Sequence, residues 1–392
     1  MNIVLFDEEQ NRKNLLPLTF TRPVAEIRVG ILTIKQKWDS FLNTTCSYVT
    51  EDYLAEKYPV KKEPGSIYIN GCVCPDETLI KALGTIKSGQ KFMHQGKLIA
   101  WSGDGGIPAK YEKVEYTRAL VMINNVWDIF QKNADALKSD FELLTKNKTS
   151  QPLSKTVTVI GDPKLIFLEG GAKAEACIFN TTGGPIYLAA DSEVMEGTAI
   201  RGPLSLGEHS VLKLNTKIYG ATTIGPHCKV GGEVSNSVIF GYTNKAHDGF
   251  LGNSVLGEWC NLGADTNNSN LKNNYGNVKL FNYNINKQMD TGLQFCGLIM
   301  GDHSKSGINT MFNTGTVVGV AANIFGGGFP PTRVPDFSWG GEKGFETYRQ
   351  EKLFETAAKV FERRNLTFDQ QEKDILNTVF KLTEAYRNEN VS

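Results

Sequence analysis

Aliphatic side chains recur at every sixth residue in the middle of this chain. The unbroken run consists of Leu188, Val194, Ile200, Leu206, Leu212, Ile218, Ile224 and Val230. Neither an α-helix, with its period of 3.6 residues, nor a plain strand, with its period of 2, requires this spacing. Each side of a left-handed parallel β-helix takes six residues, and one aliphatic residue per side points inward. Hexapeptide repeats are a sequence signature of such solenoids, so the pattern predicts one rather than an ordinary β-sandwich.

The repeat continues beyond Val230 after a slip of two residues near Asn236. The inward positions then predicted are Val238, Asn244 as a polar exception, Phe250, Leu256 and Leu262. An excursion follows over about residues 265–298. The period returns at Met300, Ser306 as an off-type residue, Phe312, Val318 and Ile324. Irregular coils and extrusions lower local stability and often carry function, so we expect the chemistry near the slip and the excursion.

The flanking segments have other patterns. Before the solenoid, short apolar strands such as 3–6 alternate with helical segments such as 32–41 and a long helix within 119–144, which favours an α/β fold. After it, apolar residues at helical spacing predict C-terminal helices. We therefore predict an α/β domain over residues 1–150, a β-helix over 151–335 and a helical extension over 336–392.

Composition excludes several classes of function. The 42 basic and 42 acidic residues of the 392-residue chain balance, so no nucleic-acid or membrane surface is indicated. The N-terminus resembles no signal segment, and no apolar stretch reaches membrane-spanning length, so we expect a cytoplasmic protein. The seven cysteines are scattered without a CxxC pair, which indicates free thiols and no metal site.

Four histidines share one place in their hexads. His209, His227, His247 and His303 each follow a predicted inward position by three residues, and we expect the first three to stack in one column. A metal bridge, a general base and polar decoration of an outward face are the three interpretations. The surroundings single out His247, because it follows the slip directly.

The segment around His247 resembles the acetyltransferase half of the bifunctional GlmU enzymes, which make UDP-N-acetylglucosamine. That family has a Lys-Ala-Gly-His pattern, then Asn-Ile-Gly-Ala-Gly-Thr, then an extruded loop with Asn-Tyr. This chain has Lys245-Ala246-His247, then Asn261-Leu262-Gly263-Ala264, then Asn274-Tyr275. The resemblance implies His247 as the catalytic base, Asn261 as a substrate ligand and Ala264 as the backbone amide that faces the acetyl-CoA thioester. It also implies a substrate role for the Asn274–Tyr275 loop.

The chain departs from that family at several substrate positions. Phe250 replaces a tyrosine, and Gly231 and Ser235 replace the arginine and lysine that hold the sugar phosphate. Three nearby cations are candidate replacements: Lys229, Lys245 and Lys272.

The N-terminal segment Leu16-Pro17-Leu18-Thr19-Phe20-Thr21-Arg22-Pro23 is similar to a motif of sugar-1-phosphate nucleotidyltransferases. Their glycine-rich phosphate loop is missing, Val24 replaces the catalytic lysine, and Cys72 replaces the metal-binding aspartate. The cations predicted to hold phosphates here, with surface charge as the alternative, are Arg12, Lys13, Arg22 and Arg28. Over nearly the whole chain the pattern resembles divergent GlmU-like proteins.

The resemblance implies an α/β nucleotidyltransferase-like (Rossmann-like) domain followed by the β-helix, and a homotrimer. The trimer also agrees with apolar wall residues such as Val211 and Phe240. The implied activity is acetyl transfer from acetyl-CoA to glucosamine 1-phosphate. Uridylyl or thymidylyl transfer from a nucleoside triphosphate to a sugar 1-phosphate with Mg²⁺, nucleotide-sugar binding without catalysis, and a non-catalytic assembly subunit are the alternatives.

Overall fold

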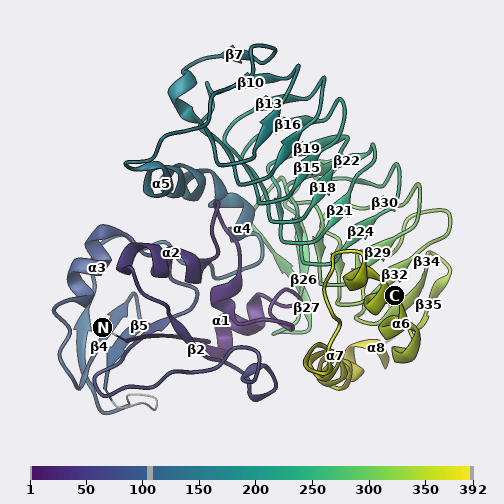
Figure 1. Ribbon diagram of the computed structural model, residues 1–392. Helices are drawn as coiled ribbons and strands as arrows, with labels where there is room; N and C mark the ends of the chain where they lie inside the picture. The colour runs from purple at the N-terminus through teal and green to yellow at the C-terminus, as the bar shows by residue number, and fades with distance from the viewer. Residues whose placement is uncertain (1, 104–108, 389–392) are drawn as a thin grey trace.

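A computed structural model describes residues 2–103 and 109–388 (Figure 1). The N-terminal region, the part of the chain before β7, is a mixed sheet with helices around it. The strand order is β2-β1-β3-β5-β4-β6, and β1 pairs in parallel with both β2 and β3. The strands are β1 (Ile3–Phe6), β2 (Ser47–Val49), β3 (Ile67–Asn70), β4 (Gln90–His94), β5 (Lys97–Ser102) and β6 (Glu112–Glu115).

The helices of this region are α1 (Glu9–Asn14), α2 (Ile34–Leu42), α3 (Glu77–Leu83), α4 (Asp128–Gln131) and α5 (Asn133–Thr145), with short 3₁₀ turns η1 (Val24–Glu26) and η2 (Asp52–Leu54). The α/β prediction is confirmed. The helix predicted within 119–144 begins only at Asp128 and is divided after Gln131.

The middle of the chain is the predicted left-handed parallel β-helix, whose three walls are parallel sheets. The first wall contains β7 (Thr158–Ile160), β10 (Ile178–Asn180), β13 (Ala199–Arg201), β16 (Lys217–Tyr219), β19 (Glu233–Ser235) and β22 (Phe250–Gly252). Its last coils carry β25 (Asn267–Asn268) and β30 (Met311–Phe312).

The second wall contains β8 (Ile166–Leu168), which follows the 3₁₀ turn η3 (Pro163–Leu165), then β11 (Ile186–Leu188), β14 (Leu204–Leu206), β17 (Thr222–Ile224), β20 (Val238–Ile239), β23 (Val255–Leu256), β28 (Ile299–Met300), β31 (Val317–Val318) and β33 (Arg333–Val334). The third wall contains β9 (Lys173–Ala174), β12 (Glu193–Val194), β15 (Val211–Leu212), β18 (Lys229–Val230), β21 (Asn244–Lys245), β24 (Asn261–Leu262), β29 (Lys305–Ser306), β32 (Asn323–Ile324), β34 (Ser338–Gly341) and β35 (Gly344–Thr347).

The six-residue period places its aliphatic residues as predicted. Leu188, Leu206 and Ile224 lie in register on successive coils of the second wall and are fully buried. After the excursion, Met300 stacks on Leu256, and Val318 stacks on Met300. This stack of apolar side chains buries surface continuously along the solenoid axis.

The predicted phase between Val238 and Phe250 is wrong by one residue. The register pairs Ile224 with Ile239, Val230 with Lys245, and Val234 with Leu251. These coils are shortened to fifteen to seventeen residues instead of eighteen, so the irregularity removes residues instead of adding two. Because neighbouring side chains on a strand point to opposite faces, the shift turns Val238 and Phe250 away from the interior.

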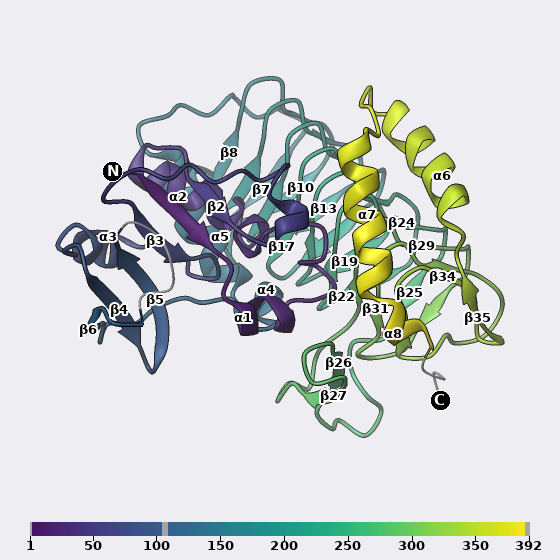
Figure 2. The same ribbon diagram turned by 90° about the horizontal axis from the view of Figure 1, so that it is seen from below.

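The excursion contains a hairpin of β26 (Lys279–Asn282) and β27 (Lys287–Asp290), which reaches the N-terminal region. Asn282 and Asn284 donate to Oδ1 of Asn14 at 3.4 and 3.1 Å. Figure 2 shows this hairpin extending from the solenoid, with the C-terminal helices lying along its coils. Those helices are α6 (Gln350–Glu362), α7 (Gln370–Leu382) and α8 (Glu384–Asn388).

The outer face of the second wall packs against the N-terminal region. Val238, Phe240 and Val255 are buried in the same hydrophobic cluster as Phe20 and Val24. Phe240 is therefore covered within the chain, and the expectation that it is exposed on an outer wall is wrong. In residues 2–103 and 109–388, no helix is long and apolar enough to cross a membrane.

Candidate functional site

The predicted acetyltransferase residues lie together at the corner that ends the third wall. Asn244 pairs in register with Asn261, so His247 and Ala264 occupy equivalent places on adjacent coils. The backbone N–H of Asp265 donates to the carbonyl of Asp248 at 3.1 Å, which fixes the two turns against each other. Neighbouring strands lie about 4.8 Å apart, so His247 is one coil from Ala264. His247 and Asn261 are both exposed.

The imidazole of His247 is available to a ligand. Within the described part of the chain it makes no hydrogen bond or ion pair with another side chain, whereas its backbone is held firmly. Its carbonyl accepts a hydrogen bond from Nζ of Lys245 at 2.8 Å.

Lys245 occupies an interior position of the β-helix and is 2% exposed. Its ammonium donates to the carbonyls of Gly231 and His247, at 2.9 and 2.8 Å. Burial lowers the pKa of Lys245 to about 8, against the opposing effect of Asp248 and Asp265. The structure therefore places this lysine inside the coil rather than beside a substrate phosphate.

The predicted histidine column is wrong at His247. The shortened coils put Tyr242 above His227, with ring centroids 4.8 Å apart, and Trp259 follows at 4.2 Å. His209 and His303 lie at the two ends of this aromatic ladder. Burial lowers the pKa of His303 well below its usual range, and its ring stacks on Trp259 and Phe361.

The remaining predicted β-helix residues are spread along the solenoid. Lys229 is exposed on the third wall, one coil before Asn244. Lys272 lies in the excursion and donates to the carbonyl of Asn277 at 2.8 Å. In the same loop Asn274 is exposed and Tyr275 is 66% exposed. Only Lys229 of these four lies on the wall that carries His247.

A second candidate site is a cavity of about 830 Å³ at the carboxyl ends of β1 and β3. Phe6, Tyr68 and Trp101 form its aromatic surface, and the rings of Tyr68 and Trp101 stack with centroids 4.7 Å apart. The indole N–H of Trp101 is buried and finds no acceptor among the described residues. Lys62 and Lys97 also line this cavity.

Three carboxylates at the same cavity are already paired. Asp7 binds Arg12 at 2.9 Å, Glu8 accepts from the N–H of Asn11 at 2.8 Å, and Glu9 binds Lys13 at 2.5 Å. Burial raises the pKa of the Cys72 thiol, and Mg²⁺ prefers oxygen ligands, so Cys72 does not fit the metal position implied by the resemblance.

The four cations predicted to hold phosphates in the N-terminal region do not line this cavity. Arg12 is buried and also donates to Tyr53 at 2.9 Å, and Lys13 is on the surface with Glu9. Arg28 donates to the carbonyl of Ile31.

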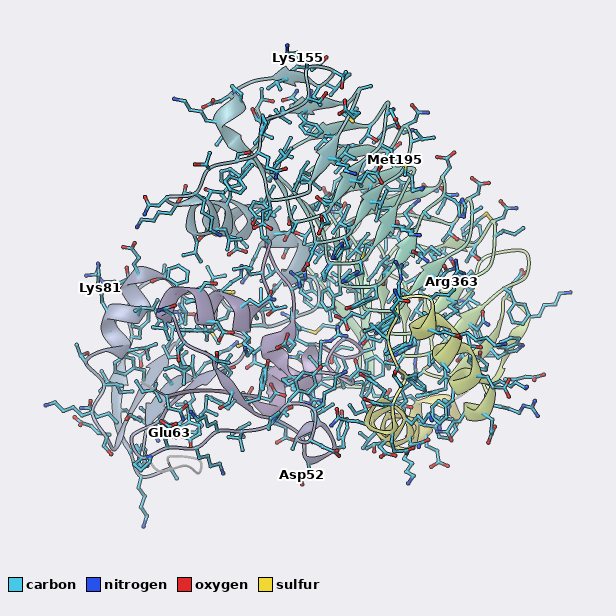
Figure 3. All side chains as sticks on the ribbon, viewed as in Figure 1. Asp52, Glu63, Lys81, Lys155, Met195 and Arg363 are labelled. Carbon is cyan, nitrogen blue, oxygen red and sulfur yellow. The ribbon has the colours of Figure 1, made fainter. Side chains whose placement is uncertain are left out.

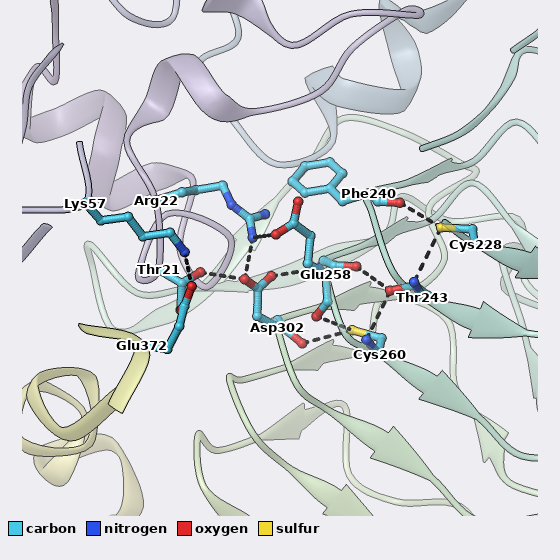
Figure 4. A network of polar contacts seen from close by, with 12 residues as sticks. Thr21, Arg22, Lys57, Cys228, Phe240, Thr243, Glu258, Cys260, Asp302 and Glu372 are labelled. Atoms are coloured by element: carbon cyan, nitrogen blue, oxygen red, sulfur yellow. Dashed lines mark hydrogen bonds and ion pairs between the residues drawn. The ribbon is translucent and has the colours of Figure 1, made fainter. Parts of the chain in front are cut away.

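Arg22 joins the N-terminal region to the β-helix. It is 3% exposed and pairs with Asp302 and, at 3.2 Å, with Glu258 (Figure 4). Thr21 donates to the same Asp302 at 2.6 Å. The Thr21–Arg22 part of the motif therefore holds two parts of the chain together.

Sequence reasoning missed Tyr68, Lys97 and Trp101. All three lie on strands where alternate side chains face away from the helix-covered core. An aromatic residue at such a position is the sequence feature that indicates this site.

The fold joins a sugar-nucleotidyltransferase-like region to a left-handed parallel β-helix. Residues 3–149 match the family model for sugar nucleotidyl transferase. The chain is a divergent relative of the GlmU-like proteins.

Individual relatives support this placement. The bifunctional protein GlmU of Synechococcus elongatus is 28% identical over 165 residues, which cover 40% of this chain and 32% of that protein. The bifunctional sugar-1-phosphate nucleotidylyltransferase/acetyltransferase of Sulfurisphaera tokodaii is 31% identical over 147 residues, covering 37% of this chain and 36% of that protein. The chain thus spans about a third of the length of these relatives. The crystal structure of the polySia specific acetyltransferase NeuO is 13% identical, with 58% of this chain and 94% of that chain covered and a TM-score of 0.28, which is too low to support a conclusion.

Proposed function

We propose that the β-helix transfers the acetyl group of acetyl-CoA to the amine of glucosamine 1-phosphate. The observation that carries this proposal is the exposed His247 one coil from Ala264, with Asn261 on the same wall. His247 takes the proton of the attacking amine, and the new C–N bond forms as the thioester C–S bond breaks. The backbone N–H of Ala264 donates to the oxyanion, Asn261 orients the sugar, and the proton leaves with the CoA thiol.

The proposed assembly is a homotrimer, because the corner of His247 is open in a single chain. Leu214 and Ile308 lie at this corner on coils before and after it and are 59% and 71% exposed. A neighbouring copy would cover these apolar side chains and close the site against water.

Acetyl transfer is tested by incubating the protein with acetyl-CoA and glucosamine 1-phosphate and identifying the product by mass spectrometry. We expect a product heavier by one acetyl group. Glucosamine without phosphate is the matched acceptor control and should react poorly. Absence of any acetylated sugar phosphate would refute the proposal.

For the N-terminal region we propose binding of a nucleotide sugar with little or no nucleotidyl transfer. The stacked Tyr68 and Trp101 rings, and an indole N–H that has no acceptor among the described residues, favour a ligand with an aromatic base. Among the described residues, the three carboxylates of the cavity already have partners, and Cys72 is a poor Mg²⁺ ligand, which argues against the active uridylyl or thymidylyl transferase. A cavity lined by these rings and by Lys62 and Lys97 also argues against a purely assembly role.

The test measures pyrophosphate release from UTP or dTTP with N-acetylglucosamine 1-phosphate and Mg²⁺, alongside nucleotide-sugar binding by calorimetry. We expect turnover below about 1 per second, the low end of ordinary enzymes. We expect Trp101→Ala to weaken nucleotide-sugar binding, with the exposed Lys110→Ala as a control. Fast pyrophosphate release would show that the catalytic groups have been rebuilt from other residues.

A further inference from the structure

Four cations gather on the third wall. Lys213 and Lys229 come from successive coils, and Arg363 and Arg364 come from the turn that follows α6. In the described ranges 2–103 and 109–388, none of these four side chains forms an ion pair. Figure 3 labels Arg363, which follows α6, and Met195, which follows β12 in an earlier coil of the third wall.

Packing fixes the end of α6 in this position. Phe361 stacks on Trp259 of the aromatic ladder, with ring centroids 3.9 Å apart, and is 4% exposed. Arg364 then donates to Oδ1 of Asn244 at 3.3 Å. Asn244 is the register partner of Lys229, so the arginine pair and the lysine pair face each other across one or two coils.

The cations are close enough to act on one another. The pKa of Lys229 is lowered, first by partial burial and then by the charges of Arg364, Lys213 and Arg363. Like charges held together destabilise the folded chain, and a multivalent anion would relieve this repulsion.

We propose that Lys213, Lys229, Arg363 and Arg364 form a binding site for a phosphate group of a substrate. The proposal deepens the acetyl-transfer function and rests on it for the identity of the substrate. Lys229 is level with Asn244, which lies three residues before His247, or about 10 Å along the chain. The long side chains of the cations can reach across part of this distance. The C-terminal helices would thus supply the phosphate ligands that Gly231 and Ser235 do not provide.

Two ligands carry the required chemistry: the phosphate of the sugar 1-phosphate, and the phosphates of coenzyme A. The experiment measures dissociation constants by calorimetry for glucosamine 1-phosphate, CoA and dephospho-CoA. The test variant is Arg363→Gln with Arg364→Gln, in the full chain. The control is Arg349→Gln with Lys352→Gln, which removes the same charge from the other end of α6.

We expect the Arg363/Arg364 variant to bind one of the two phosphate ligands at least about tenfold more weakly, since hydrogen bonds to charged groups are strong. The control variant should bind like the unmodified protein. Loss for glucosamine 1-phosphate alone identifies the sugar phosphate. Loss for CoA, with dephospho-CoA unaffected, identifies the 3′-phosphate; loss for both CoA forms identifies the diphosphate.

Equal binding of every ligand by the test and control variants would overturn the proposal, as would failure of the unmodified protein to bind either compound. Melting curves of both variants check that the fold is intact. A protein that binds a phosphate ligand through these residues but forms no acetylated product keeps the site and loses the proposed function, so the two failures are distinguishable.

Discussion

At the scale of single residues, Lys245 has a pKa that is set by its interior position in the β-helix. Lys245 points into the coil, at a position that is aliphatic in the neighbouring coils. Its amine lies between two backbone carbonyls. A neutral amine keeps two N–H groups, so both hydrogen bonds can survive loss of the charge. Burial therefore favours the neutral form without removing the contacts that hold the backbone of His247.

The lowered pKa of Lys245 predicts how stability changes with pH. Between the folded value of about 8 and the ordinary value of 10.5, the unfolded chain binds more protons than the folded chain, so this residue favours folding more as pH rises. We expect the free energy of unfolding, relative to Lys245→Met, to increase by up to about 3 kcal/mol from pH 7.5 to pH 10.5. Urea unfolding at both pH values measures this difference, and a difference independent of pH would contradict it.

At the scale of elements, the segment that follows α1 carries a buried ion pair that links the N-terminal region to the β-helix. Arg22 and Asp302 are both buried, and Asp302 also accepts from Thr21 and from the N–H of Glu258. A partner removed from such a group leaves a buried charge without compensation.

We expect Arg22→Met to lower the free energy of unfolding by about 3–5 kcal/mol, because Asp302 then remains buried without its cation. Lys13→Met, which removes a surface cation close to Glu9, is the control and should leave the midpoint unchanged. Denaturant unfolding followed by tryptophan fluorescence makes the comparison. Equal midpoints for both variants would mean that the Arg22 contact does not hold the regions together.

At the scale of the whole molecule, the sequence predicts repeating features well and long-range pairings poorly. The period of six predicts the β-helix because each inward residue depends only on its neighbours along the axis. The position of Lys245 depends on coil lengths that no local pattern reports, so the predicted phase is wrong by one residue. The N-terminal motif predicts phosphate binding by Arg22, and its actual partner, Asp302, lies 280 residues away in the chain, beyond the reach of any local pattern.

Part of the candidate site can be predicted from the sequence, and part depends on long-range contacts. The order and spacing of His247, Asn261 and Ala264 follow a motif, and the structure brings them together on adjacent coils. Arg363 and Arg364 reach the same wall only because Phe361 packs on Trp259, a contact between distant segments. A motif search cannot detect such contacts, because they join residues that are far apart in the sequence.

The open corner around His247 predicts the assembly state. Because Leu214 and Ile308 are exposed beside it, we expect the protein to be a homotrimer at micromolar concentration. Multi-angle light scattering measures the mass directly. Leu214→Glu with Ile308→Glu should dissociate the trimer and abolish acetyl transfer together. A stable, active monomer would remove the shared-site argument.

The central claim is that His247 is the general base for acetyl transfer, while the histidines of the aromatic ladder are packing or surface groups. The most direct measurement is the initial rate of CoA release from acetyl-CoA, with glucosamine 1-phosphate as acceptor, for His247→Ala and His209→Ala. We predict that His247→Ala lowers the rate by about 10²–10⁴, the usual effect of losing a general base, and that His209→Ala leaves it nearly unchanged. Equal, small effects of the two substitutions would contradict the account.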